Sequence, residues 1–235
     1  MLAVAEKIRV HNWTLQKEAG IDLIPSNDFS LYDQVLDFSF TINAIPERFA
    51  PTQNLSELKQ YFAIARGYQK DGIDVTASEM TKWFDTNYHY IVPEFTKNQA
   101  FSIKVNKPLQ EYNLAKKHGF ETKPVLLGII TYLLLGKEKE AGFHRLELAD
   151  RLLPVYIEIV QSLVDAGAKT IQIDEPYLVL DLPKGAAEAY KKVYSALKTK
   201  FPHTEFILTT YFGALENNTE LAVSLPFDVL HIDIV

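Results

Sequence analysis

The stretch that decides the fold is residues 152–176, which read LLPVYIEIVQSLVDAGAKTIQIDEP. Apolar residues recur at the spacing of one helix face from Leu152 to Leu163, which predicts a helix that faces the core. Gly167 follows where a C-terminal helix cap is expected. The β-branched run at 170–174 then predicts a short strand that ends before Pro176, because proline cannot continue a central strand. A helix, a glycine and a strand together form one αβ unit.

The same unit recurs along the chain. Downstream, a helix at Ala186–Thr199 precedes strand candidates at Phe206–Tyr211 and Val229–Ile234. Upstream, further strand candidates lie at Asp22–Pro25, Lys82–Asn87 and Pro124–Ile130, and we interpret the whole apolar run Pro124–Leu135 as a buried strand running into its loop. Strands that alternate with helices favour a parallel sheet. We therefore predict an α/β fold, an incomplete (β/α)8 TIM-type barrel with about six parallel strands and surrounding helices.

Residues 1–235 are expected to form one partial barrel. The chain opens in a predicted helix, Leu2–Ala19, with no strand ahead of it, and stops at Val235 in or just after a strand. Because a closed barrel of this class needs eight strands, we expect that sequence is missing at both ends. Residues 45–78 contain two prolines and two glycines around a predicted helix, Leu55–Ala65. We interpret them as an excursion inserted over one end of the barrel.

Composition excludes several classes of protein. Hydrophobic residues make up 47% of the 235 residues and charged residues 23%, which is ordinary globular usage. The net charge of -6 provides no general attraction to nucleic acid or to an anionic membrane. The absence of cysteine rules out disulfides, thiolate nucleophiles and sulfur-ligated metals in these residues. Charged side chains interrupt the first twenty residues, so we predict neither a signal peptide nor a membrane span, and expect a cytoplasmic protein.

Polar residues gather where the predicted strands end. The clusters are Ser26–Asp28, Asp85–Asn87, Asp174–Glu175 and Thr209–Tyr211. Strand ends of this kind form the functional rim of a barrel, although Asp, Asn and Thr also cap the helices that follow strands. Asp174 and Glu175 are adjacent, so in a strand they would point to opposite faces and could not act as a carboxylate pair.

A longer motif gives a more specific indication. Residues 80–90 read MTKWFDTNYHY and are followed by VPEF at 92–95. Further segments are GIDLIP at 20–25 with Asp28 and Phe29, KPVLLG at 123–128, QIDEP at 172–176 and TTYF at 209–212. These segments, in this order and spread over the whole chain, resemble the amino-terminal barrel of cobalamin-independent methionine synthase.

The resemblance implies a function for a longer protein. By this resemblance, the full-length protein would consist of two fused barrels. It would transfer a methyl group from 5-methyltetrahydropteroyl polyglutamate to homocysteine, which gives methionine. Zinc and homocysteine are implied to bind the second barrel. By this resemblance the present chain would supply folate-tail binding and structural support. We predict no catalytic residue here, and expect the chain alone to be inactive.

The same resemblance assigns one binding residue. The family counterpart of Lys82 contacts the negatively charged folate tail, and a lysine ammonium is a suitable flexible charge for carboxylates. The alternative is that Lys82 is a solvated surface lysine. A second family element for this ligand, an Arg-Glu-Leu-Lys stretch, has no match in this sequence. Residues 209–212 occupy the place where the second barrel has its zinc-binding His and Cys; they offer no good zinc ligand, and we predict no metal in this chain.

Other interpretations remain open from the sequence. His89 lies in an aromatic run and could be a general base or a stacking residue, although a packed core histidine is favoured. The chain could also be a free-standing TIM-barrel hydrolase that uses Asp174, Glu175 or Asp233, or a non-catalytic binding module. The length of the native gene product separates these hypotheses, because only the synthase requires a second, cysteine-containing barrel.

Overall fold

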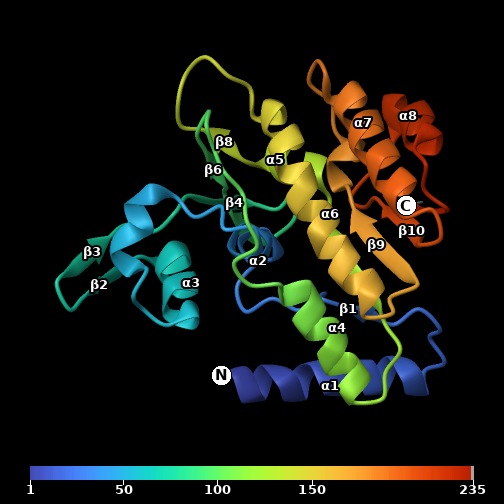
Figure 1. The fold of residues 1–235 in the computed structure, drawn as a ribbon, viewed down its shortest axis with the longest axis horizontal. Helices are drawn as coiled ribbons and strands as arrows, with labels where there is room; N and C mark the ends of the chain where they lie inside the picture. The colour runs from blue at the N-terminus through green and yellow to red at the C-terminus, as the bar shows by residue number, and fades with distance from the viewer. Residues whose placement is uncertain (234–235) are drawn as a thin grey trace.

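The structure is a computed structural model that describes residues 1–233 (Figure 1). The α-helices are α1 (Leu2–Glu18), α2 (Gln34–Thr41), α3 (Glu57–Arg66), α4 (Lys107–Lys117), α5 (Ile129–Leu135), α6 (Ala149–Asp165), α7 (Ala186–Lys200) and α8 (Thr219–Ser224). Short 3-10 helices are η1 (Glu47–Thr52), η2 (Arg145–Leu148), η3 (Pro176–Val179) and η4 (Glu216–Asn218). Most of these helices lie around a central sheet, whereas α3 lies to one side of it (Figure 1).

The central sheet is parallel and has five strands within residues 1–233. Its order is β1 (Pro25–Ser26), β7 (Lys123–Leu127), β9 (Thr170–Asp174), β10 (Glu205–Thr209) and β11 (Val229–His231). Leu127 is in register with Asp174, and Asp174 with Thr209, so these three strands end together at one edge. Parallel strands that alternate with helices confirm the α/β prediction and are consistent with an incomplete TIM-type barrel.

The two faces of this sheet differ in character. One face presents Ile171, Ile173 and Leu208, each fully buried, to the core that also contains the apolar side of α6. The helical spacing that predicted α6 therefore places its apolar residues as expected. The opposite face, which we call the inner face, carries Gln172 and Asp174, because successive side chains of a strand alternate. The inner face is thus the polar one.

Residues 82–87 were predicted as a barrel strand, and this prediction was wrong. Strand β4 (Met80–Lys82) ends at Lys82 and pairs antiparallel with β5 (His89–Ile91), outside the central sheet. Phe84 lies in the left-handed region with φ of 52°, and the Trp83 N–H donates to the Tyr88 carbonyl across the turn. The segment is therefore a hairpin with a tight tip, and the described sheet has five parallel strands instead of about six.

The apolar run at 124–135 was also only partly interpreted correctly. Strand β7 stops at Leu127, and after Gly128 the residues predicted as strand and loop form helix α5, all seven of whose residues are buried. A short run that is apolar on every side fits a buried strand or a buried helix equally well by periodicity. The carboxylate of Glu175, distant in sequence, accepts hydrogen bonds from the first amides of α5 and so stabilises the helical conformation.

Other predicted elements agree with the structure to within a few residues. These are the helices at 2–19, 55–65 and 186–199 and the strands at 170–174 and 206–211. The strand expected at Asp22–Pro25 is short and begins at Pro25. The strand expected at Val229–Ile234 runs to His231, and Ile234 lies outside the described residues. No helix within residues 1–233 is long and apolar enough to span a lipid bilayer.

Residues 45–78 form η1, α3 and an antiparallel hairpin of β2 (Tyr68–Lys70) and β3 (Ile73–Val75). In Figure 1 this hairpin lies well to one side of the central sheet. A second, smaller core joins this segment to α2 and β5: Phe49, Tyr61 and Ile64 pack with Leu36 and Ile91. That this segment is an insertion remains a prediction.

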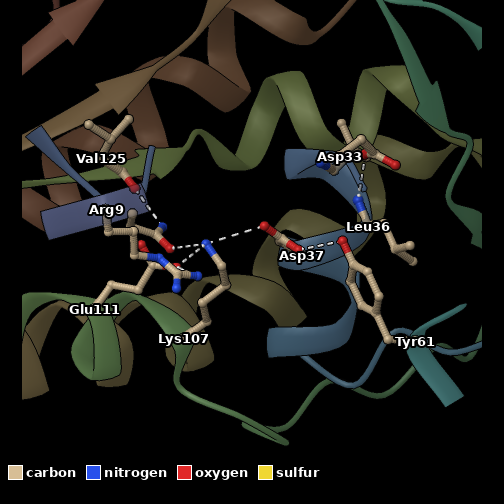
Figure 2. Close-up of polar contacts among 10 residues, drawn as sticks. Arg9, Asp33, Leu36, Asp37, Tyr61, Lys107, Glu111 and Val125 are labelled. Atoms are coloured by element: carbon tan, nitrogen blue, oxygen red, sulfur yellow. Dashed lines mark hydrogen bonds and ion pairs between the residues drawn. The ribbon is translucent and has the colours of Figure 1, made fainter. Parts of the chain in front are cut away.

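A buried charge cluster joins α1, α2 and α4 on the side of β1 (Figure 2). Lys107 Nζ lies 3.2 Å from an Asp37 oxygen and 2.9 Å from a Glu111 oxygen, and it donates to Asn27 at 2.7 Å. Arg9 on α1 reaches the same Glu111 oxygen at 2.8 Å. Because these groups are largely buried, the cluster holds the loop that follows β1 against α4 and ties α4 to α1 and α2.

Candidate functional site

A cavity of about 560 Å³ opens between the inner face of the sheet and the hairpin β4–β5. We call it the lumen cavity. Its sheet side includes Lys123, Val125, Gln172 and Asp174, and its hairpin side includes Trp83, Tyr88, His89 and Tyr90. Asp28, from the loop after β1, and Tyr211, after β10, complete the rim. Thus three of the four polar clusters predicted to form a rim contribute to one cavity, whereas the Asp85–Asn87 cluster forms the hairpin tip.

Asp174 is the acid at the centre of this cavity. Gln172 Nε2 donates to one carboxylate oxygen at 2.7 Å, and the Tyr211 hydroxyl donates to the other at 3.3 Å. Burial raises the pKa of Asp174 to about 6, against the opposing hydrogen bond from Gln172 and the positive charge of Lys123. The group can therefore change protonation near neutral pH.

Lys123 is the cation of the cavity. Its ammonium donates to the Gln172 side-chain oxygen, so Gln172 links Lys123 to Asp174. Burial lowers the pKa of Lys123, although Asp174 and Asp28 oppose this effect. Burial also raises the pKa of Asp28. A lysine and two acids along one polar wall can bind a ligand that presents both donors and acceptors.

Glu175 points away from this cavity, as predicted from its position next to Asp174. Its carboxylate is fully buried and accepts from the backbone N–H groups of Ile130 at 3.1 Å and Thr131 at 2.7 Å. The hydroxyls of Tyr190, at 3.1 Å, and Tyr194 also donate to it. Glu175 therefore ties the end of β9 to α5 and α7. The two carboxylates have separate surroundings and cannot act as an acid and base pair.

The hairpin separates the lumen cavity from a second hollow of about 360 Å³, which we call the side pocket. Lys82 lies at the side pocket, and the neighbouring Trp83 lines the lumen cavity, because adjacent residues face opposite sides of the hairpin. Lys82 is exposed, and among residues 1–233 it has no ion-pair partner. Tyr90 lines both hollows. The binding role of Lys82 remains a prediction.

Two expectations about single residues can be compared with the structure. His89 is exposed, and its ring nitrogen lies 3.0 Å from the Asn87 carbonyl oxygen, so the packed core histidine was wrong. Asp233 accepts a hydrogen bond from the Phe212 N–H at 3.1 Å.

In the sequence, Lys123 and Gln172 stand out only as parts of motifs. Their alternation with Leu126 and Ile173, which face the core, is the sequence signal that places them at the cavity.

The residues present do not fit a zinc ion. Within residues 1–233, no group of three His, Cys, Asp or Glu side chains is placed to hold a metal. Thr209 and Thr210 are buried, and Tyr211 and Phe212 follow them at the cavity. Hydroxyls and aromatic rings are poor zinc ligands. The described residues therefore offer no set of ligands for zinc.

Comparison with known proteins decides the family. Residues 1–235 match the family described as "Cobalamin-independent synthase, N-terminal domain". This chain belongs to the cobalamin-independent synthase family. The predicted resemblance is thereby confirmed, and the match extends over the whole chain.

Relatives within the cobalamin-independent synthase family are similar to this chain along nearly its full length. A protein of Cytophaga hutchinsonii is 56% identical over 99% of the chain, one of Flavobacterium johnsoniae 52% over 100%, and one of Xylella fastidiosa 51% over 98%. All three are named 5-methyltetrahydropteroyltriglutamate--homocysteine methyltransferase. The chain spans about 30% of the length of each of these relatives.

Proposed function

We propose that this chain is the amino-terminal part of an enzyme that transfers a methyl group from 5-methyltetrahydropteroyl polyglutamate to homocysteine. The observation that carries the proposal is the 56% identity to a relative named for this reaction. Neither the hydrolase nor the free-standing binding module is favoured. The hydrolase needs cooperating carboxylates, and Asp174 and Glu175 bond to different partners on opposite sides of β9.

In this proposal the chain provides tail binding through Lys82 and supports the remainder of the enzyme. The exposed, unpaired ammonium of Lys82 supports such a role, because it can bind a carboxylate without first breaking an ion pair. Zinc and homocysteine would bind outside this chain, which offers no fitting zinc ligands within its described residues. The chain alone would then be inactive. A cytoplasmic location also belongs to this proposal.

The test uses a longer family protein that carries this chain at its amino-terminal end. We expect Lys82→Ala to raise KM for the triglutamate substrate by roughly fivefold, because one exposed charge pair contributes up to about 1 kcal/mol. KM for a monoglutamate substrate should change less. Lys70→Ala, at an exposed lysine of β2, serves as the matched control. Equal effects of Lys82→Ala on both substrates would show that Lys82 does not bind the tail.

A second measurement tests whether this chain is active without the rest of the enzyme. Residues 1–235 alone should give no methionine from the methyl donor and homocysteine, with or without added zinc. Turnover by this chain would contradict the proposal.

A further inference from the structure

We propose that Lys137 and Arg145 act with Lys82 as a three-cation subsite for successive carboxylates of an oligo-γ-glutamyl tail. This inference rests on the proposed function and deepens it. It assigns the side pocket as the place where the tail lies, and it adds two residues that the sequence motif does not contain.

The side pocket is lined by three basic side chains. Its cationic lining residues come from three separate elements: Lys82 ends β4, Lys137 begins β8 (Lys137–Glu138), and Arg145 begins η2. No acidic residue is among the described residues that line this pocket. The acids that pair with Lys137 and Arg145 lie outside the lining, so the three cations are the charged groups that a ligand in this pocket would meet. The chemistry of the lining therefore favours a ligand with several negative charges.

The cations are engaged to different degrees by nearby acids. Lys82 has no ion-pair partner among residues 1–233. Lys137 donates to Glu79 at 2.6 Å, but both side chains are about half exposed, so water screens this pair and a ligand can replace it at small cost. Arg145 is held by Glu138 through Nη1 at 3.1 Å, and its Nε hydrogen has no acceptor in the described structure. Because a guanidinium has five donors, Arg145 retains donors for a ligand carboxylate.

The remaining lining suits an extended chain with charges at intervals. Phe84, Tyr90 and Tyr177 form apolar walls between the cations. The Tyr90 hydroxyl donates to the Leu135 carbonyl at 3.1 Å, which fixes its ring at the end of α5. Methylene groups of a γ-glutamyl chain can contact such walls while the carboxylates reach the lysines and the arginine. The volume of about 360 Å³ falls within the range of about 300–1,000 Å³ for small-molecule sites.

The experiment measures binding of fluorescein-labelled tri-γ-glutamate to the 235-residue chain by fluorescence anisotropy, at low and at high ionic strength. We expect Lys82→Gln, Lys137→Gln and Arg145→Gln each to weaken binding by about three- to fivefold at low ionic strength. Lys139→Gln is the matched control. Lys139 is two residues from Lys137, is similarly exposed, has its own acidic neighbour in Glu94 at 3.8 Å, and does not line the side pocket.

Weaker binding could also result from a misfolded variant, so a further variant is chosen that should bind tri-γ-glutamate more tightly. Glu79→Gln removes the acid that binds Lys137, and since Glu79 is about half exposed the fold should not depend on it. We expect Glu79→Gln to tighten tri-γ-glutamate binding about twofold, and unchanged or weaker binding would overturn the role of Lys137. Circular dichroism of every variant confirms that it is folded.

The outcomes separate the two proposals. If Lys82→Gln weakens binding but Lys137→Gln and Arg145→Gln do not, the three-cation subsite is overturned and the role of Lys82 stands. If the wild-type chain binds tri-γ-glutamate no better than it binds glutamate, both fall. Competition by inorganic tripolyphosphate at equal strength would reveal a general anion site and overturn the assignment to a glutamyl tail. Competition by unlabelled tri-γ-glutamate alone supports it.

Discussion

Replacing Glu175 by glutamine should destabilise the protein by about 2 kcal/mol. Each carboxylate oxygen accepts one backbone N–H, from Ile130 or Thr131, and one tyrosine hydroxyl. Glutamine keeps one of the two oxygens and places an NH2 group where the other was. A hydroxyl can rotate to accept from that NH2 group, but a backbone N–H cannot, so one buried donor loses its acceptor at a cost of about 1–3 kcal/mol.

Alanine at position 175 should cost about 4 kcal/mol or more. Four buried donors then lose their acceptor, each at about 1 kcal/mol or above. Because small domains are stable by only about 5–15 kcal/mol, Glu175→Ala should remove a large part of the total. Urea unfolding followed by the fluorescence of Trp13 and Trp83 measures both losses. Glu158→Gln, on the exposed side of α6, is the control. A change below about 0.5 kcal/mol for Glu175→Gln, the size of an ordinary surface substitution, would refute this reasoning.

Gly128 provides an independent test of the same contact. Its backbone is in an ordinary extended conformation, with φ of -69°, so an alanine there is not strained by its own dihedral angles. An added Cβ would nevertheless lie 2.2 Å from the Glu175 Oε1 atom. Gly128→Ala should therefore cost about 1–3 kcal/mol in the wild type and much less in the Glu175→Ala background. Additive costs in the double variant would show that the two residues do not interact.

Two further predictions concern charged groups. Burial raises the pKa of Asp174 from 3.8 to about 6, so the stability due to its protonated form is fully present below about pH 4 and lost as pH rises through 6. Asp174→Asn should remove a fall of about 3 kcal/mol between pH 4 and pH 7 in the unfolding free energy, and an unchanged pH slope would contradict this. Lys107→Met should cost about 3 kcal/mol, because Asp37 loses its buried cation and Glu111 keeps only Arg9. Adding Asp37→Asn to Lys107→Met should recover part of that loss in thermal unfolding, whereas no recovery would show that the charge is not the cause.

The sequence was sufficient where the pattern of one segment determines its structure. The helix predicted from Leu152, which begins at Ala149, and the strand ending at Asp174 were predicted correctly, because one side of each is apolar and the other is not. The opposite directions of Asp174 and Glu175 followed from strand alternation alone. These features need no information from the rest of the chain.

The sequence was insufficient where distant residues decide. Helix α5 receives hydrogen-bond acceptors for its first amides from Glu175, which lies more than forty residues away in sequence. The hairpin after Lys82 has a β-rich composition like that of a barrel strand, and its antiparallel partner decides the difference. Lys137 and Arg145 belong to no motif with Lys82; only the fold brings them to the same pocket.

Tyr90 has a consequence for the hairpin as a whole. Its ring forms part of the wall of both the lumen cavity and the side pocket, and its hydroxyl is anchored to Leu135. Any substitution of Tyr90 would therefore change the lining of both hollows at once and remove the hydrogen bond to Leu135. One aromatic side chain thus sets the width of two separate hollows, and a smaller residue at position 90 would join them more openly to each other.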